Sequence, residues 1–144
     1  MAVKPKIIRT DAEIETPRLD AALRRRGELV LLADGVSEER LARETGEAEL
    51  LLMCYTPVTA RVIAAAGRLK GIVKYGVGID AIDIPAARAR GIAVVNIPEY
   101  AEETVAEGAF ALMIALAKKL VPLQRQMQAE ARRPGAVGTR PPAG

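Results

Sequence analysis

Two glycines separated by one residue follow directly on an apolar run that is typical of a buried strand. Gly76 and Gly78, together with Ala81, form the pattern Gly-x-Gly-x-x-Ala. This is a loose version of the fingerprint that places a dinucleotide pyrophosphate between a strand and a helix N-terminus. Two other interpretations are open: the glycines can serve only a tight turn, or the backbone N–H groups of Val77 and Gly78 can form a small nest for a carboxylate.

The dinucleotide interpretation requires partners that the sequence does not supply. The next helix begins only near Asp83, too far beyond the glycines. The acidic residue that binds the ribose is expected about 20 residues on, where the next strand ends in Asn96 instead. A cofactor loop is therefore disfavoured here. Asn96 is predicted to fix its own turn rather than to contact a ligand.

The chain contains no histidine. Histidine is the usual general acid or base near neutral pH and a common metal ligand, so Ser-His-Asp and Cys-His chemistry and most zinc sites are excluded within this sequence. Two acidic groups resemble ligand sets: Asp80 with Asp83, and Glu102 with Glu103 and Glu107. Helix capping and the helix dipole explain both groups, so no metal site is predicted.

The elements that carry these residues alternate between strand and helix. Thr16, Ser37 and Asp83 are predicted N-caps. The predicted strands cover residues 6–9, 28–33, 49–55, 71–75 and 92–96, and the predicted helices residues 17–26, 37–46, 59–66 and 84–90. This alternation predicts an α/β fold, a doubly wound parallel sheet of about five strands.

In such a sheet, ligands bind beyond the carboxyl ends of the strands. Four loops are expected to meet at that edge. They are residues 34–35, 55–57, 75–78 and 96–98. A site, if the domain has one, is predicted among them.

The pattern changes after Pro98. Residues 99–131 are predicted to form one long helix, with Pro122 marking a kink or break. Residues 108–117 carry no charge, a run too short for a bilayer, which needs about 20 residues. Because this run is apolar all round, it is expected to meet another domain or subunit. Residues 1–98 then form the α/β domain, and residues 132–144 are predicted to be disordered.

The charge of +3 comes from the C-terminal end of the chain, where Glu130 is the only acidic residue among six basic ones after residue 117. A basic tail without interleaved aromatic residues disfavours a nucleic-acid partner. The single cysteine, Cys54, is what a reducing cytoplasm permits, and the N-terminus has no secretory apolar region. A cytoplasmic location is therefore predicted.

Several separate blocks resemble one enzyme family in order and spacing. They are residues 56–59, 69–83, 87–98 and the Thr-Val-Ala-Glu motif of residues 104–107. Together these blocks strongly resemble the N-terminal half of the D-isomer-specific 2-hydroxyacid dehydrogenases. The resemblance runs from about Lys6 to Leu120 and implies a flavodoxin-like substrate domain, followed by a long helix that crosses to a separate nucleotide-binding domain, which also builds the dimer.

The resemblance also implies roles for residues. The turn formed by Tyr75, Gly76, Val77 and Gly78 is expected to bind the carboxylate of a small 2-hydroxy or 2-oxo acid. Val77, and the helix start marked by Thr104 and Val105, are expected beside an NAD or NADP cofactor.

In the family, the phosphate-binding glycine motif, the substrate arginine, the glutamate and the catalytic histidine lie downstream of the matching region. The resemblance therefore implies that this chain is inactive alone; a truncation, a frameshifted end and a free-standing half-enzyme are all open. Because residues 108–117 are apolar and would be uncovered, the residue 101–121 helix is expected to drive homodimerisation or further self-association. The alternative is a non-catalytic module that binds carboxylates or other proteins.

Overall fold

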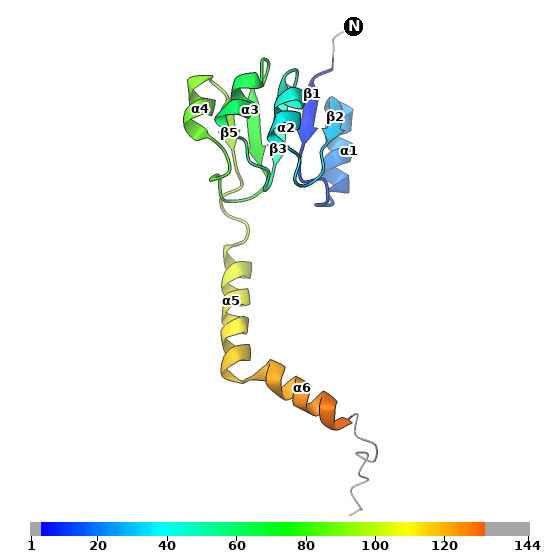
Figure 1. Cartoon of the computed structure of the whole chain (residues 1–144), viewed down its shortest axis with the longest axis vertical. Helices are drawn as coiled ribbons and strands as arrows, with labels where there is room; N and C mark the ends of the chain where they lie inside the picture. Colours follow the sequence, from blue (N-terminus) through cyan, green and yellow to red (C-terminus); the bar gives the residue numbers. More distant parts are fainter. Residues whose placement is uncertain (1–3, 132–144) are drawn as a thin grey trace, which may run out of the picture. The chain divides into compact units, whose positions relative to one another are not determined.

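The computed structural model of the chain describes residues 4–131 (Figure 1). Contacts divide it into two units, one ending at Tyr100 and one beginning at Ala101. The first unit alternates strictly between strand and helix. Its elements are β1 (Lys6–Arg9), α1 (Pro17–Arg26), β2 (Glu28–Leu31), α2 (Glu38–Thr45), β3 (Leu50–Met53), α3 (Ala60–Ala65), β4 (Gly71–Lys74), α4 (Ile84–Ala89) and β5 (Ala93–Val95).

The five strands form one sheet in the order β2-β1-β3-β4-β5, and every pair of neighbours is parallel. This is the flavodoxin-like order, in which the strand order reverses at β1 and β3. The predicted doubly wound parallel sheet of five strands is confirmed. Its apolar strands form near-continuous runs because a parallel sheet is covered by helices.

The handedness of the crossovers assigns each helix to a face. The β1-to-β2 connection runs in the opposite direction along the sheet from the other three, so right-handed crossovers place α1 on one face and α2, α3 and α4 on the other. Contacts of α3 with both α2 and α4 agree with this layer. The main core lies beneath these three helices and includes Ile8, Leu51, Met53, Ile72 and Val62.

The opposite face is covered unevenly. Arg9, Leu52, Val73 and Val95 are in register across four neighbouring strands and therefore share this face. Arg9 and Leu52 are buried near α1, whereas Val95 on the edge strand is 55% exposed. The sheet thus leaves an apolar strip uncovered toward β5.

Side-chain capping follows the sequence at two of the three predicted positions. Ser37 accepts from the N–H of Arg40, and Asp83 accepts from the N–H of Ala86, so both predicted N-caps are confirmed. Thr16 makes no capping bond. Its hydroxyl lies 3.2 Å from the carboxylate of Asp20, to which it donates.

Arg90 joins two helices of the same layer. It lies at the C-terminal end of α4, and its guanidinium donates to the carbonyl oxygens of Ile63 (2.9 Å), Ala64 (2.6 Å) and Ala66 (3.0 Å) at the end of α3. A cation is favourable at a helix C-terminus, where the last carbonyls lack helical partners. Arg90, at the end of α4, therefore caps the C-terminal end of α3.

The second unit contains α5 (Glu102–Ala117) and α6 (Leu120–Ala131). The sequence predicts a single long helix with a kink or break at Pro122. Instead there are two helices, and the helical conformation is interrupted at Lys118 and Lys119. Lys119 has a φ of 52°. A proline ring clashes with the carbonyl four residues before it, so the helix is interrupted there, and Pro122 fits the first turn of α6.

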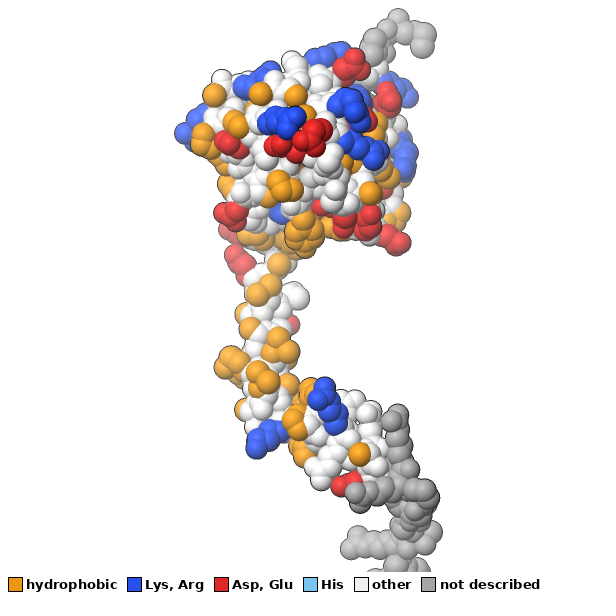
Figure 2. All heavy atoms as spheres, in the orientation of Figure 1, with side chains coloured by type: hydrophobic (Ala, Val, Ile, Leu, Met, Phe, Trp, Pro, Cys, Tyr) orange, Lys and Arg blue, Asp and Glu red, His pale blue; other side chains and the backbone are white. Residues whose placement is uncertain are grey.

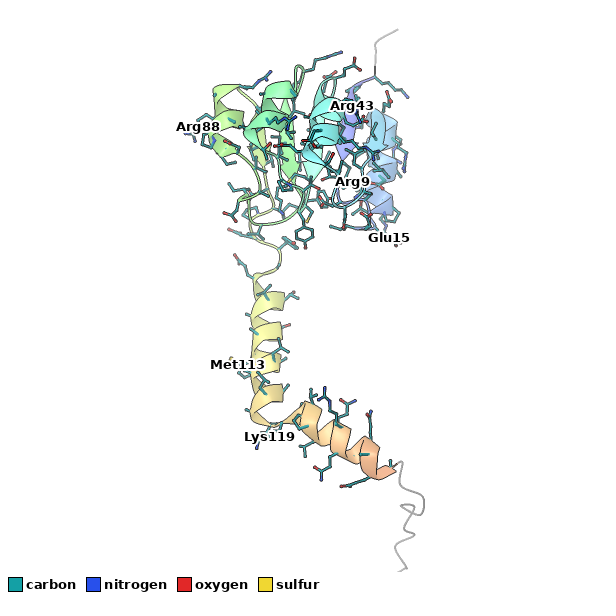
Figure 3. All side chains as sticks on the ribbon, viewed as in Figure 1. Arg9, Glu15, Arg43, Arg88, Met113 and Lys119 are labelled. Atoms are coloured by element: carbon teal, nitrogen blue, oxygen red, sulfur yellow. The ribbon has the colours of Figure 1, made fainter. Side chains whose placement is uncertain are left out.

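The side chains of α5 and α6 are exposed along their length, including Phe110 and Met113 (Figures 2 and 3). Among residues 4–131, no helix is long and apolar enough to cross a membrane. The predicted disordered tail, residues 132–144, lies outside the described residues.

Candidate functional site

The carboxyl edge of the sheet gathers the loops that follow the strands. The four predicted loops, residues 34–35, 55–57, 75–78 and 96–98, all follow parallel strands and so reach this edge. A fifth loop, formed by Thr10 and Asp11 after β1, joins them. Sequence reasoning missed it because a single threonine and aspartate after a short strand resemble an ordinary polar turn.

The glycine turn is anchored at its start to the last residue of β3 and beyond its end to the loop after β3, which we call the β3 loop (residues 54–58). At the start, the N–H of Tyr75 donates to the carbonyl of Met53 at 3.1 Å. At the end, Val58 pairs with the chain beyond the turn: its N–H donates to Ala81 (2.8 Å), and its carbonyl accepts from Asp83 (2.9 Å). The position of the turn is thus set by the end of β3 together with the β3 loop.

The carbonyl groups of Gly76 and Val77 have partners, whereas the N–H groups of Gly76, Val77 and Gly78 have no protein acceptor among residues 4–131. The Gly76 carbonyl accepts from the N–H of Ile97 at 3.1 Å, and the Val77 carbonyl accepts from Asn96 Nδ2 at 2.7 Å. No acceptor within residues 4–131 binds the N–H of Val77 or Gly78. Val77 is 44% exposed, so this backbone is open to a ligand, and paired N–H groups are donors suited to an anion.

The glycines of the turn are explained by space rather than by backbone angle. Neither Gly76 nor Gly78 has a positive φ; among the described glycines only Gly35 and Gly91 do. A nest built from left-handed residues is therefore not the geometry here. A Cβ on Gly76 would lie 2.9 Å from Cε of Lys74, so this glycine makes room for a lysine side chain.

Lys74 is a buried cation next to the turn, with only 8% of its surface exposed. Its ammonium donates to the carbonyl of Cys54 and lies 5.3 Å from the centre of the Tyr55 ring. None of the ion pairs among the described residues includes it. Because a buried charge without a counter-ion is costly, this position favours an anionic ligand. The feature of the sequence that could have indicated this role is a charged residue, Lys74, at the end of an otherwise apolar strand.

The hydroxyl of Tyr75, a predicted substrate-binding residue, already has a protein partner. It donates to the carbonyl of Thr10 at 2.6 Å. Burial raises the pKa of this phenol to about 12, and the nearby Asp11 carboxylate adds to the increase. Tyr75 is therefore a neutral anchor at neutral pH.

The loop after β2 is acidic and offers a poor site for a carboxylate. A hollow of about 220 Å³ lies between this loop and the β3 loop, lined by residues that include Asp34, Val36 and Tyr55. The backbone N–H of Asp34 donates to the Glu13 carboxylate at 2.8 Å. The hydrogen bond to the Glu13 carboxyl raises the pKa of Asp34 to about 6 and lowers that of Glu13. The two carboxyl groups thus share a proton over part of the pH range.

The turn does not fit a dinucleotide pyrophosphate. Helix α4 begins at Ile84, six residues after Gly78, and is six residues long. Its N-terminus is already occupied by the Asp83 carboxylate, whose Oδ1 lies 2.9 Å from the N–H of Ala86. A pyrophosphate there would meet a negative charge instead of free N–H groups.

The remaining predicted contacts lie in the second unit. Thr104 and Val105 are in α5, and Val105 is 66% exposed; their role beside a cofactor stays a prediction. Asn96 binds the neighbouring turn through Val77 rather than its own turn. No group of three or more Cys, Asp or Glu side chains suited to a metal ion occurs within the described part of the chain.

The topology defines an α/β domain with a five-stranded parallel sheet, and the unpartnered N–H groups lie in a loop at the carboxyl edge of that sheet. Residues 8–133 match the family model for the D-isomer specific 2-hydroxyacid dehydrogenase, catalytic domain. The chain belongs to this family.

Individual relatives agree with the family. The chain is 43% identical over 107 residues to a D-3-phosphoglycerate dehydrogenase of Archaeoglobus fulgidus, covering 74% of this chain and 20% of that protein. It is 39% identical over 79 residues to a glyoxylate reductase of Korarchaeum cryptofilum, covering 55% and 24%. The chain thus spans about a fifth to a quarter of these relatives.

Solved structures show the same fold. A D-lactate dehydrogenase from Aquifex aeolicus, complexed with NAD and lactic acid, superposes with a TM-score of 0.74 at 25% identity and covers 89% of this chain and 38% of that one. A protein from Thermus thermophilus superposes with a TM-score of 0.77 at 26% identity, covering 90% and 42%.

Proposed function

We propose that this chain is the substrate-binding half of an NAD(P)-dependent oxidoreductase that interconverts a D-2-hydroxy acid and a 2-oxo acid. The observation that carries the proposal is the pair of unpartnered N–H groups at Val77 and Gly78 beside the buried ammonium of Lys74. Hydrogen-bond donors near a poorly solvated cation favour a carboxylate over neutral ligands. Membership of the family supplies the reaction class.

Each group of the turn has a part in binding. The N–H groups of Val77 and Gly78 donate to the carboxylate, and the Lys74 ammonium adds a favourable charge. The carbonyls of Gly76 and Val77 are held by the loop after β5, so these acceptors do not compete with the ligand. The result is a bound acid that presents its second carbon for reaction.

Hydride transfer needs groups that this chain does not provide. NAD or NADP accepts or supplies the hydride when bound, mainly on a second domain, with Val77, Thr104 and Val105 as the proposed contacts from this chain. The proton on the substrate oxygen requires an acid–base group near neutral pH, and the sequence has no histidine. We therefore propose that the chain binds the acid and is inactive alone.

The test separates binding from turnover. Calorimetry of the 144-residue chain with glyoxylate, pyruvate and hydroxypyruvate is expected to show binding, and methyl glyoxylate, which lacks the free carboxylate, is expected to bind much less. Lys74→Met keeps an unbranched side chain that is one atom shorter and removes its charge, so it is expected to weaken glyoxylate binding. Equal binding of glyoxylate and its methyl ester contradicts the carboxylate site.

Activity is tested by supplying the second domain. Fusing the chain to the nucleotide-binding domain of the Archaeoglobus fulgidus relative is expected to produce oxidation of NADH or NADPH with a 2-oxo acid, while the unfused chain shows none. Absence of turnover in a folded fusion with every acid tested argues against the oxidoreductase assignment.

A second candidate is a non-catalytic module that binds carboxylates or other proteins. The exposed apolar side chains of α5, among them Phe110 and Leu116, favour this interpretation, because such a surface marks an interaction site. Glyoxylate binding without turnover in the fusion favours the module. We propose that α5 mediates homodimer formation or further self-association.

The single buried, free Cys54 is compatible with the predicted cytoplasmic location.

A further inference from the structure

We propose that Asp11 is a positioning residue of the carboxylate site: its buried side chain fixes the β3 loop, and the β3 loop in turn fixes the turn that carries the Val77 and Gly78 N–H groups. Asp11 belongs to neither the predicted substrate contacts nor the predicted cofactor contacts. The inference rests on the proposed function for its effect on ligand binding, but the positions of the loop and turn can be tested independently.

The Asp11 carboxylate accepts an unusual number of hydrogen bonds from the β3 loop. Its Oδ2 accepts from the N–H of Cys54 at 2.7 Å and of Tyr55 at 3.1 Å. Its Oδ1 accepts from the N–H of Thr56 at 3.2 Å and from the Thr56 hydroxyl at 3.0 Å. Three successive backbone N–H groups therefore depend on one side chain that is 2% exposed.

Backbone hydrogen bonds at the two ends of the β3 loop connect it to the chain on either side of the turn. Met53, just before the loop, accepts from the N–H of Tyr75, and Val58 at its end pairs with Ala81 and Asp83. The residues held by Asp11 lie between these two attachments. A shift of the loop is therefore expected to move the chain that follows the turn, through the pairing of Val58 with Ala81 and Asp83.

A second connection runs through the neighbour of Asp11. The Thr10 carbonyl accepts from the hydroxyl of Tyr75, the first residue of the turn, and the Thr10 hydroxyl donates to Asp11 Oδ2 at 2.7 Å. Asp11 and Thr10 thus hold the turn by two routes, one through the backbone of the β3 loop and one through a phenol. The loop after β1 is the common support.

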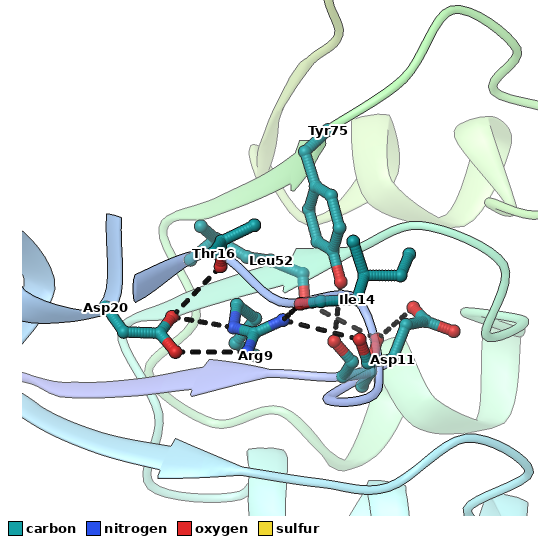
Figure 4. A network of polar contacts seen from close by, with 8 residues as sticks. Arg9, Asp11, Ile14, Thr16, Asp20, Leu52 and Tyr75 are labelled. Carbon is teal, nitrogen blue, oxygen red and sulfur yellow. Dashed lines mark hydrogen bonds and ion pairs between the residues drawn. The ribbon is translucent and has the colours of Figure 1, made fainter. Parts of the chain in front are cut away.

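The backbone at Asp11 is itself strained and clamped. Its φ of 55° lies in the left-handed region, which is uncommon for residues other than glycine. Arg9 Nη1 donates to the carbonyls of Asp11 (3.3 Å) and Ile14 (3.2 Å), and its Nε lies 2.9 Å from Asp20 Oδ1 (Figure 4). The two Nη1 hydrogen bonds of Arg9 thus hold the loop after β1 through its backbone carbonyls.

Asp11→Asn tests the proposal, with Asp20→Asn as the matched control. Asparagine has the same size and tolerates the left-handed region, but its amide nitrogen cannot accept and would face N–H donors. Asp20→Asn makes the same chemical change in the same network, at a residue that contacts Arg9 and Thr16 but not the β3 loop.

The readouts are the backbone amide resonances of Gly76, Val77 and Gly78 in the full chain, the titration of Tyr75, and glyoxylate affinity. In Asp11→Asn the three resonances are expected to move, the pKa of Tyr75 to fall from about 12, and glyoxylate to bind about tenfold more weakly. Asp20→Asn is expected to lower stability while the resonances and affinity stay within about twofold of their original values.

Three outcomes decide the inference. Unchanged turn resonances in Asp11→Asn, or equal effects of the two substitutions, overturn it. If the unsubstituted chain binds no glyoxylate, the carboxylate site fails, and the resonances and the Tyr75 titration still decide the role of Asp11. If Asp11→Asn does not fold, Thr56→Val removes one donor to Asp11 and is expected to move the same resonances by less; no movement overturns the inference.

Discussion

Asn96 donates a 2.7 Å hydrogen bond from its side-chain amide to the backbone carbonyl of Val77. The next residue, Ile97, donates its N–H to the carbonyl of Gly76. Two adjacent residues after β5 therefore hold two adjacent carbonyls of the glycine turn. Their combined effect is to fix the peptide units of the turn while leaving the Val77 and Gly78 N–H groups free of protein acceptors in the described chain.

Removing the Asn96 amide is expected to loosen the turn. Asn96→Ala loses one hydrogen bond at an exposed site, worth about 1 kcal/mol, so glyoxylate is expected to bind about fivefold more weakly. Isothermal calorimetry measures this change. Gln126→Ala, which removes an exposed amide hydrogen bond within α6, serves as the control and is expected to leave binding unchanged. Equal affinity in the two variants contradicts a role for Asn96.

Adding a methyl group at Gly76 is expected to displace Lys74. The new Cβ would lie 2.9 Å from Lys74 Cε, and overpacking of a buried site costs about 1–3 kcal/mol. Gly76→Ala is therefore expected to lower the free energy of unfolding and to weaken glyoxylate binding, as measured by urea denaturation and calorimetry. Gly108→Ala in α5, where no atom lies within 4 Å of the new Cβ, is expected to be neutral or stabilising.

Acid is expected to destabilise the domain through Asp11. Burial raises the pKa of this carboxyl, but the hydrogen bonds from Cys54, Thr10, Thr56 and Tyr55 outweigh it and hold the pKa below its ordinary value. A carboxyl with a lowered pKa in the folded state stabilises the fold above the unfolded-state pKa, near about 4, and this contribution is lost as the pH falls further. Urea denaturation between about pH 5 and 3 is expected to show the loss, with a smaller slope in Asp11→Asn.

Asp34 is expected to titrate far above an ordinary aspartate. The hydrogen bond with the Glu13 carboxyl raises its pKa to about 6, so its carboxyl keeps a proton at about pH 5. Carbon-detected NMR of the side-chain carboxyl measures this titration. Glu13→Gln removes the neighbouring charge and is expected to return Asp34 toward ordinary values, and an unshifted Asp34 in the unsubstituted chain contradicts the shared proton.

Self-association is expected to depend on α5. Replacing the exposed Leu112 and Leu116 by glutamate places charges on an apolar surface, which opposes burial against a second copy. Sedimentation equilibrium is expected to show dimers or larger species for the original chain and a shift toward monomer for the double variant. Gln124 and Gln128 replaced by glutamate in α6 give a control of equal charge. A strictly monomeric original chain at high concentration refutes the proposal.

The sheet was predictable because its signals are local and repeated. Apolar runs such as residues 50–53 alternate with helices that end at glycines, and each crossover has only one common handedness. The helix break was misplaced because the effect of Pro122 falls on the turn before it, at Lys118 and Lys119. A proline marks an interruption in the sequence, but the geometry of the clash decides where it occurs.

The site was predictable only in part. The turn at residues 75–78 could be recognised because glycines at a strand end are visible in the sequence. Asp11 and Lys74 could not, since their importance comes from partners at least 20 residues away along the chain, such as Cys54. The role of Gly76 also depends on a side chain two positions earlier whose burial only the fold determines.

The hydrogen bonds from Arg90 to the end of α3 link the local unfolding of α3 to that of α4. Because one guanidinium binds the carbonyls of Ile63, Ala64 and Ala66, α3 cannot fray at its C-terminus without releasing α4. The amide protons of these two short helices are therefore expected to exchange with solvent in a single cooperative event. Strand β4, which lies between them in the sequence, is paired on both sides within the sheet and is expected to stay protected during this opening.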